Sequence, residues 1–321
     1  MMKKFNVGYL YILLCALIFS FVEVALKATT GMFHPMQITV LRFLVGGAVL
    51  QPFAQRGMKA RGARFTRDDA KFFAGLGFLF VVVAMMAYQM AVLHTQASVV
   101  AVLFSCNPIF ITLLAGPILH EPIKKNHVLA LCLEAAAVLI IIDPIHARLD
   151  PLGCALSLLA ALLFALYSVA GRKRANRLGG IAITSFCSLF GGAELLLLLL
   201  LGNTAPGAAL FEALRLSLFV RAPLLKTLTA ASVPWVLYLG AINTGLGFVL
   251  HMMAMEKTSA QTASLAYFLK PVLSPLFALA ILHEVIRLNM WLGILCFVVG
   301  SGVAILPGVI EEQKTEKVSN P

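Results

Sequence analysis

The sequence predicts an all-α polytopic membrane protein with ten transmembrane helices, arranged as two inverted five-helix repeats. Three observations predict this class. Of the 321 residues, 60% are apolar and only 12% are charged, which is unlike a soluble domain with one core. The apolar residues gather into ten runs, most of them long enough to cross a bilayer as helices. The second half of the chain also resembles the first, and each half carries five runs.

The ten runs follow one another along nearly the whole chain, separated by polar segments. The first run lacks a clear small-residue cleavage site and ends in Glu23 and Lys27. We therefore expect it to be retained as a helix rather than removed as a signal peptide. The expected spans are residues 6–26, 35–53, 72–92, 97–118, 127–143, 151–170, 181–201, 233–253, 260–282 and 289–307.

Similarity between the two halves indicates a duplicated five-helix unit. Residues 91–144 align without a gap on residues 254–307, with 15 identities in 54 positions. Apolar composition inflates such a count, so matched special residues such as Pro108 and Pro271 carry more weight. The organisation we expect is a first repeat over residues 1–145, a second repeat over 146–307 and a polar cytoplasmic tail over 308–321.

Basic residues predict the orientation of these spans. The segments 54–71 and 171–180 carry ten Lys and Arg residues, and such clusters are typical of cytoplasmic loops. We expect both termini in the cytoplasm and a plasma (inner) membrane location in a bacterium-like cell. Because each repeat holds an odd number of spans, the two repeats face opposite ways, as in alternating-access transporters.

A lysine inside the ninth span is the feature around which the site is predicted. Lys270 lies ten or more residues from either end of its span, about 15 Å deep, where an ionisable group is costly and by default functional. Pro271 follows it, and Asn107 and Pro108 hold the equivalent positions of the fourth span. Paired interruptions in corresponding spans point to a binding site. We expect both prolines to kink their helices, Lys270 to hold an anionic group of the substrate and Asn107 to bind a neutral polar group.

Other polar groups within the spans have two interpretations each. Lys270 can instead be a permanent partner of Glu23 or Glu194. Glu23 either forms a surface pair with Lys27, four residues further along its helix, or has a role in the cavity. Arg42 lies about 10 Å from the end of its span and can partly reach the surface, so its contact with substrate is left open. The remaining candidates for substrate binding are Tyr88, Tyr167, Asn243, His251 and Tyr267, single cases of which usually serve helix packing.

Carboxyl groups inside spans are candidates for coupling transport to protons. Glu134 and Glu194 lie well within the fifth and seventh spans, and Glu23 lies near the end of the first. Such groups can carry a proton across the membrane. We favour Glu194; the alternative is a neutral, hydrogen-bonded carboxyl that serves packing.

The pattern over residues 96–121, repeated over 260–284, resembles the EamA-type repeat of the drug/metabolite transporter superfamily. The shared features are small residues at the start of the span, the mid-span proline and the exit Leu-His-Glu, which ends at Glu121 and Glu284. The resemblance covers residues 6–307 and implies a ten-helix exporter or importer of small metabolites, often amino acids. It further implies that spans 1–4 and 6–9 enclose a central cavity, with spans 5 and 10 to one side. Glu134 departs from the family pattern, which has a small or apolar residue there.

Several other classes of function find no support in the sequence. The His-Glu pairs lack the second histidine of a zinc helix, so we expect Glu121 and Glu284 to serve the turn into the following helix, and we expect no metal. There is no nucleotide-binding glycine motif, and we expect no cofactor, no nucleic-acid partner and no enzymatic activity. A membrane enzyme acting on lipid head groups would need carboxylates or histidines clustered on one membrane face, and this chain scatters them.

The function that we favour is secondary active transport of a small metabolite, by alternating access and in the direction of export. An amino-acid-like substrate is the first choice, and the alternative is an uptake carrier for a phosphorylated or nucleotide-linked metabolite. The expected partners are the substrate, the lipid bilayer and protons. The oligomeric state is left open, with a monomer as one option.

The orientation is testable by labelling. We expect single cysteines at Lys59 and Ala175 to resist a membrane-impermeant thiol reagent in intact cells and to react after permeabilisation, because both lie in basic segments. Ready labelling of both sites in intact cells would overturn the orientation.

Overall fold

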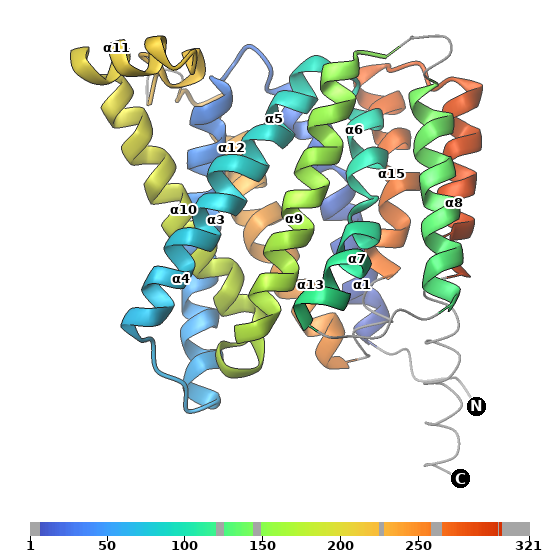
Figure 1. Ribbon diagram of the computed structural model, residues 1–321, viewed down its shortest axis with the longest axis horizontal. Coiled ribbons are helices and arrows are strands. Elements are labelled where there is room, and N and C mark those ends of the chain that lie inside the picture. Colours follow the sequence, from blue (N-terminus) through green and yellow to red (C-terminus); the bar gives the residue numbers. More distant parts are fainter. Residues whose placement is uncertain are drawn as a thin grey trace.

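The protein is a bundle of helices that stand side by side, as Figure 1 shows. The computed structural model describes residues 7–119, 125–143, 149–224, 228–257, 265–300 and 302–303. Within these residues the only β-type pairing is an isolated bridge between Thr30 and Phe33. The predicted all-α class is therefore confirmed.

The helices of the first half follow the predicted spans, several of them in two or three consecutive segments. Their bounds are α1 (Val7–Ser20), α2 (Val22–Ala28), α3 (Pro35–Ala60), α4 (Arg67–Gly77), the π-helix η1 (Phe78–Ala84), α5 (Met85–His94), α6 (Ala97–Phe104), α7 (Asn107–Leu119) and α8 (Lys125–Ile142).

The helices of the second half also follow the predicted spans, with an additional short helix between its second and third spans. The bounds are α9 (Pro151–Leu178), α10 (Gly180–Gly202), α11 (Ala205–Ala213), the 3-10 helix η2 (Ser217–Phe219), α12 (Val233–Leu237), the π-helix η3 (Tyr238–Leu246), α13 (Gly247–Lys257), α15 (Leu265–Leu282) and Leu288–Gly300.

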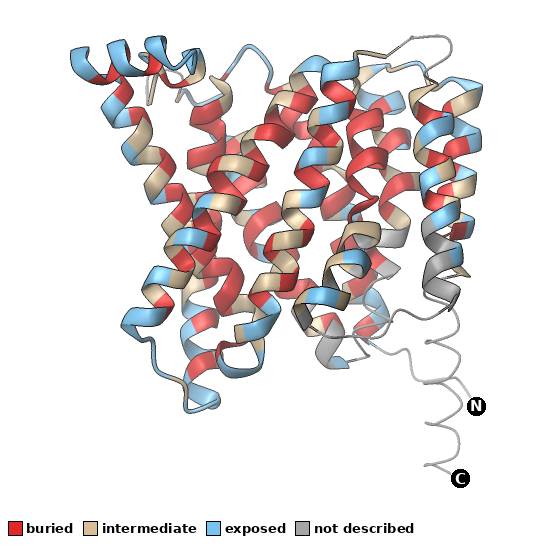
Figure 2. Ribbon diagram, in the orientation of Figure 1, coloured by how far each residue is buried: buried red, intermediate tan, exposed pale blue. Residues whose placement is uncertain are grey.

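Length and hydropathy identify these helices as membrane spans. Among the described residues, six helices are long and apolar enough to cross a bilayer, and four shorter apolar helices occupy the remaining predicted spans. Figure 2 shows buried residues concentrated inside the bundle. Large apolar side chains on the outside are suited to contact lipid; examples are Leu139, Leu197, Leu288 and Leu295, each more than 60% exposed. The chain is a multi-pass membrane protein.

Two of the predicted loops are in large part helical. The segment 54–71 was expected as a loop, but α3 continues to Ala60; 171–180 was also expected as a loop, but α9 continues to Leu178. The prediction followed the end of the apolar run. Lys and Arg are good helix formers, and their charge is favourable at helix C-termini, so the helices extend beyond the apolar part.

An ionic cluster joins these two basic segments. The buried carboxylate of Asp69, near the start of α4, accepts hydrogen bonds from Arg174 and Arg177 of α9. Arg177 also donates to the backbone carbonyl of Arg64 at 3.1 Å. Thr66 caps α4 through a reciprocal pair of bonds with Asp69, which fixes the carboxylate. The α3–α4 and α9–α10 connections therefore lie together at one end of the bundle, opposite α11 (Figure 1).

Glycines allow the closest helix contacts, as expected for membrane helices. A Cβ atom at Gly191 would lie 2.2 Å from the carbonyl oxygen of Gly77, so α10 contacts the end of α4 directly. A Cβ atom at Gly46 would lie 2.5 Å from the Thr244 side chain, which brings η3 against α3. These approaches place α3 and η3 beside each other in the middle of the bundle.

The connection after α10 contains a short helix, α11 (Ala205–Ala213), followed by η2. Phe211 and Phe219 are buried against each other, with ring centroids 5.3 Å apart. These apolar residues thus pack on the end of α10.

The two halves differ at the paired prolines. In the fourth span, α6 ends at Phe104 and α7 begins at Asn107, so the helix is interrupted directly before Pro108. In the ninth span, α15 runs through Pro271 without interruption. Proline is well tolerated in the first turn of a helix, which explains why the break in the fourth span precedes it.

Candidate functional site

A cavity lies inside the bundle, between helices of both halves of the chain. Its empty space is about 700 Å³, including the part that opens to the exterior. The described side chains that line it are Phe19, Val22, Arg42, Phe43, Phe80, Met85, Tyr88, Phe104, Ser105, Asn107, Phe164, Asn243, Thr244, Phe248 and Lys270.

These lining residues come from the first four spans and from the sixth, eighth and ninth. Among them none belongs to α8, to α10 or to Leu288–Gly300. Figure 1 shows α8 at the edge of the bundle. This arrangement agrees with the central cavity that the family resemblance implies, except that α10 supports α3 from outside and contributes no described lining residue.

The centre of the site is an ion pair between the two halves. The Nζ atom of Lys270 lies 2.6 Å from Oε1 of Glu23. The Tyr88 hydroxyl donates to the same oxygen at 2.5 Å, and the Ser274 hydroxyl donates to Oε2 at 3.3 Å. Glu23 has no exposed surface, and Lys270 is 6% exposed. Both carboxylate oxygens are therefore engaged, and helices α2, α5 and α15 meet at one charge.

This geometry is that of the second hypothesis for Lys270, in which a glutamate is its partner, and the glutamate is Glu23. The surface pair of Glu23 with Lys27 is wrong. Lys27 instead donates to the backbone carbonyls of Val92 at 2.7 Å and Thr95 at 2.8 Å, at the end of α5. The i, i+4 spacing is correct, but a fully buried carboxylate requires partners inside the bundle, and those come from other helices.

Arg42, unlike Lys270, has no ion-pair partner among the described residues. It is 5% exposed and lies over the ring of Phe43, with Cζ 4.6 Å from the ring centroid. Its Nη2 atom contacts the Met85 sulfur at 3.3 Å, while Nε and Nη1 are buried with no hydrogen-bond partner in the described part of the protein. Arg42 lines the cavity rather than reaching the surface, so a strongly polar, incompletely satisfied cation is present there.

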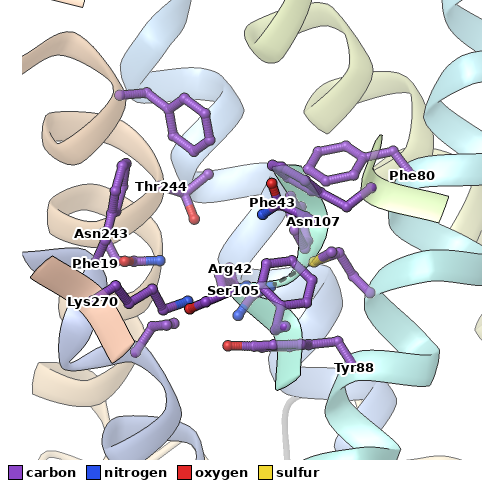
Figure 3. Close-up of a pocket in the computed structure, with 15 residues that line it drawn as sticks. Phe19, Arg42, Phe43, Phe80, Tyr88, Ser105, Asn107, Asn243, Thr244 and Lys270 are labelled. Carbon is purple, nitrogen blue, oxygen red and sulfur yellow. Dashed lines mark hydrogen bonds between the residues drawn. The ribbon is translucent and has the colours of Figure 1, made fainter. Parts of the chain in front are cut away.

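The two asparagines also line the cavity. Asn107 is 7% exposed and Asn243 is 8% exposed. The Oδ1 atom of Asn243 is buried and has no donor among the described groups. Figure 3 shows Lys270, Arg42 and Tyr88 directed toward one region of the cavity, with Asn243 and Thr244 nearby.

Other predicted candidates lie away from the lining. The Tyr167 ring stacks on Phe80 with centroids 4.0 Å apart, and its hydroxyl shares a hydrogen bond with Thr184 at 3.1 Å. His251 is buried on α13, with its ring 6.5 Å from that of Phe19. The side chain of Tyr267 lies outside the described residues. Tyr167 therefore supports the wall of the cavity through Phe80.

The two further candidates for coupling are also outside the cavity lining. Glu134 is 3% exposed on α8. Glu194 is half-buried on α10, and its Oε2 atom is buried without a hydrogen-bond partner in the described residues. Neither belongs to the described wall of the cavity, so a role in coupling would be exerted at a distance from the substrate.

Glu284 does not serve the turn before the last helix, which corrects the prediction. It accepts hydrogen bonds from the backbone N–H groups of Ala97 and Ser98 at 2.7 and 3.1 Å, and from the Ser98 hydroxyl at 2.6 Å. These are the free N–H groups at the start of α6, which favour a carboxylate. Glu284 thus ties the second half to the first. Glu121 lies outside the described residues.

The sequence prediction missed most of the apolar wall and the backbone that presents the polar groups. The π-helices η1 and η3 occupy the third span of each half, and they contribute Phe80, Asn243 and Thr244 to the cavity. Short π-helical segments are frequent at functional sites. Glycines around η3, such as Gly240 and Gly245, were the available signal. No group of three or more His, Cys, Asp or Glu able to hold a metal occurs in the part of the chain that the structure describes.

Comparison with known proteins identifies a family of membrane transporters. The EamA-like transporter family matches residues 6–143 and again residues 151–306. A Clostridium kluyveri protein named an uncharacterized transporter is 32% identical over 308 residues, covering 94% of this chain and 92% of that protein. An Archaeoglobus fulgidus protein with the same name is 24% identical over 305 residues, covering 95% of this chain and 97% of that protein.

A solved crystal structure has the same fold. It superposes with a TM-score of 0.61 at 21% identity, covering 93% of this chain and 96% of the other chain. An apolar helical bundle with a charged internal cavity, matched in this way, defines a membrane transport protein. The chain belongs to the EamA-like transporter family, as the sequence resemblance predicted.

The Glu23–Lys270 pair yields a stability prediction. Lys270→Met should lower the thermal stability of the purified protein, because it leaves the buried Glu23 carboxylate without its cation; breaking such a pair costs roughly 3–5 kcal/mol. Adding Glu23→Gln should restore most of the loss. Lys59→Met, at the exposed end of α3, is the matched control for removal of a lysine charge and should change little. A Lys270→Met protein as stable as the wild type would contradict the structural role of the pair.

Proposed function

We propose that the protein is a secondary active transporter that moves a small metabolite across the plasma membrane by alternating access, in the direction of export. The observation that carries this proposal is the cavity between the two halves, in which ionisable and amide groups meet inside an apolar bundle. Charged groups at such depth are costly and mark substrate or ion pathways by default. Family membership supports transport rather than an enzymatic reaction.

The proposed organisation is that of two repeats over residues 1–145 and 146–307, related by inversion, with both termini in the cytoplasm. The clustering of both basic segments at one end of the bundle supports this orientation. The Glu23–Lys270 pair and the Glu284 contacts with α6 both connect the first repeat to the second. Movement of one repeat against the other would then act directly on the cavity between them.

The proposed substrate is small and amphipathic, with an amino-acid-like compound as the first choice from the sequence. The wall is rich in phenylalanine, which suits an apolar body, and Arg42 has unpartnered donors, which suit a carboxylate. The uptake of phosphorylated or nucleotide-linked metabolites has less support. A phosphate group favours several free cations, whereas Lys270 is already paired with Glu23.

Metabolite profiling tests transport itself. Overexpression should raise the medium-to-cytosol ratio of one or a few small amphipathic metabolites relative to cells with an empty vector. Ser105→Phe, which places a ring in the cavity, should abolish the change. Equal membrane levels and thermal stability of the variant are the control. An unchanged metabolite profile with abundant, folded wild-type protein would argue against transport.

Proton coupling by Glu194 is a separate proposal. Its carboxyl is half-buried with one unpartnered oxygen, so it could bind and release a proton inside the bundle. In proteoliposomes, substrate-driven proton flux should be lost in Glu194→Gln and retained in Glu134→Gln. If both variants keep the wild-type flux, neither residue couples transport to protons.

A further inference from the structure

We infer that the cavity selects a substrate with one net negative charge and an apolar body, bound through Arg42, over a zwitterion of the same shape. This inference rests on the proposed transport function and specifies the charge of the transported compound. It replaces the first choice of an amino-acid-like zwitterion with a different class, the apolar monocarboxylates. It also moves the anion-binding role from Lys270 to Arg42.

The first step is the charge balance of the cavity. The described lining includes two cations, Lys270 and Arg42, and one carboxylate, Glu23, is bonded to the lining residues Lys270 and Tyr88. Lys270 and Glu23 lie 2.6 Å apart and neutralise each other. No carboxylate in the described part of the protein forms an ion pair with Arg42 within 4 Å. One positive charge is therefore left over in the empty cavity, and a substrate with one negative charge balances it.

The second step is the geometry of Arg42. Its Nε and Nη1 atoms are buried without an acceptor, while Nη2 faces the Met85 sulfur, a weak acceptor. A carboxylate binds two N–H groups on one edge of a guanidinium, either Nε with Nη2 or Nη1 with Nη2, and each of these edges in Arg42 includes one donor without an acceptor among the described groups. Buried donors of native proteins are almost always satisfied, so their presence in a cavity indicates a ligand or water that completes them.

The third step concerns the ammonium group of a zwitterion. That group requires a carboxylate, but both Glu23 oxygens are engaged by Lys270, Tyr88 and Ser274. Aromatic rings can also bind a cation, but two of the phenylalanine rings that line the cavity already contact a cation of the protein. Lys270 lies 5.0 Å from the centroid of Phe104, and Arg42 lies over Phe43. A substrate ammonium would thus meet two cations with no anion of its own.

The fourth step identifies the neutral part of the substrate. The Oδ1 atom of Asn243 is a buried acceptor without a donor, so it suits a hydroxyl or an amide N–H. The remaining wall is largely phenylalanine, including Phe19, Phe80 and Phe164. Figure 3 shows Asn243 on one side of the charged centre and Phe80 on the other. A hydroxy acid or an N-acylated amino acid with an apolar side chain fits these groups.

Matched ligands on the purified full-length protein test the inference. The probes are 3-phenylpropanoate, 3-phenyllactate, phenylalanine and 2-phenylethylamine, which share one ring and differ in charge. A second series, 4-methylpentanoate, 2-hydroxy-4-methylpentanoate and leucine, has a smaller apolar body. Binding is measured by isothermal titration calorimetry, and the shift in melting temperature is a second measurement. In each series that binds, the tightest anion should bind at least about tenfold more tightly than the zwitterion, a difference that either method resolves well.

Variants identify the residue responsible. Arg42→Gln should remove the preference for the anion, and Arg42→Lys should keep the charge but weaken binding because the fork geometry is lost. The double variant Lys270→Met with Glu23→Gln removes the neutral pair and should retain the preference. If Arg42→Gln does not fold, the ratio of the dissociation constants of the anion and the zwitterion for the wild-type protein still tests the charge selection. Zwitterion binding equal to or tighter than that of the anions, or no binding by any anion, would overturn the inference.

The result of the binding test can be distinguished from the result of the metabolite profiling that tests transport. If the cells export a zwitterion, transport stands and the charge selection fails. If the anions bind with the expected preference but no metabolite profile changes, the site stands and export fails.

Discussion

A carboxylate can stay charged inside an apolar bundle only if protein groups replace the water that it loses. Glu23 meets this condition with Lys270, Tyr88 and Ser274. These partners come from three helices and from both halves of the chain. The packing of α2 against α5 and α15 therefore depends on one charge. Removal of any partner leaves a buried polar group of this cluster without its counterion or hydrogen bond.

The same interaction determines the character of the cavity. Because Glu23 is shared between Lys270 and Tyr88, the cavity contains a neutral cluster beside the guanidinium of Arg42, whose Nε and Nη1 atoms have no acceptor among the described groups. The phenylalanine walls lower the local polarity, so this difference in charge is felt strongly by a bound molecule. The proposed selection of an anion therefore rests on which charges the protein has already neutralised, rather than on how many cations the site contains.

Hydropathy was sufficient to predict where the described residues form six membrane-length helices and four shorter apolar helices, and residue depth alone marked Lys270 as unusual. The sequence could not choose between Glu23 and Glu194 as the partner of Lys270, because Glu23 precedes Lys270 by 247 positions and the choice depends on how the helices cross. The π-helices around Phe80 and Asn243 were also beyond prediction, since the apolar pattern of a π-helix resembles that of an α-helix over so few residues. Glu284 was placed in the nearest turn because local contacts are the default expectation, whereas its acceptors are the N–H groups of Ala97 and Ser98.

The cluster of Asp69 with Arg174 and Arg177 has a consequence for movement between the halves. It joins the start of α4 to the end of α9 where both basic segments meet, and the two arginines are partly exposed, at 28% and 44% of their side-chain surface. Any rotation that separates these helix ends must break both ion pairs. Dissolved ions screen charges that have come apart, so they stabilise the separated arrangement more than the closed one. If the halves move against each other as proposed, the ionic strength at this end of the bundle would set part of the barrier to opening.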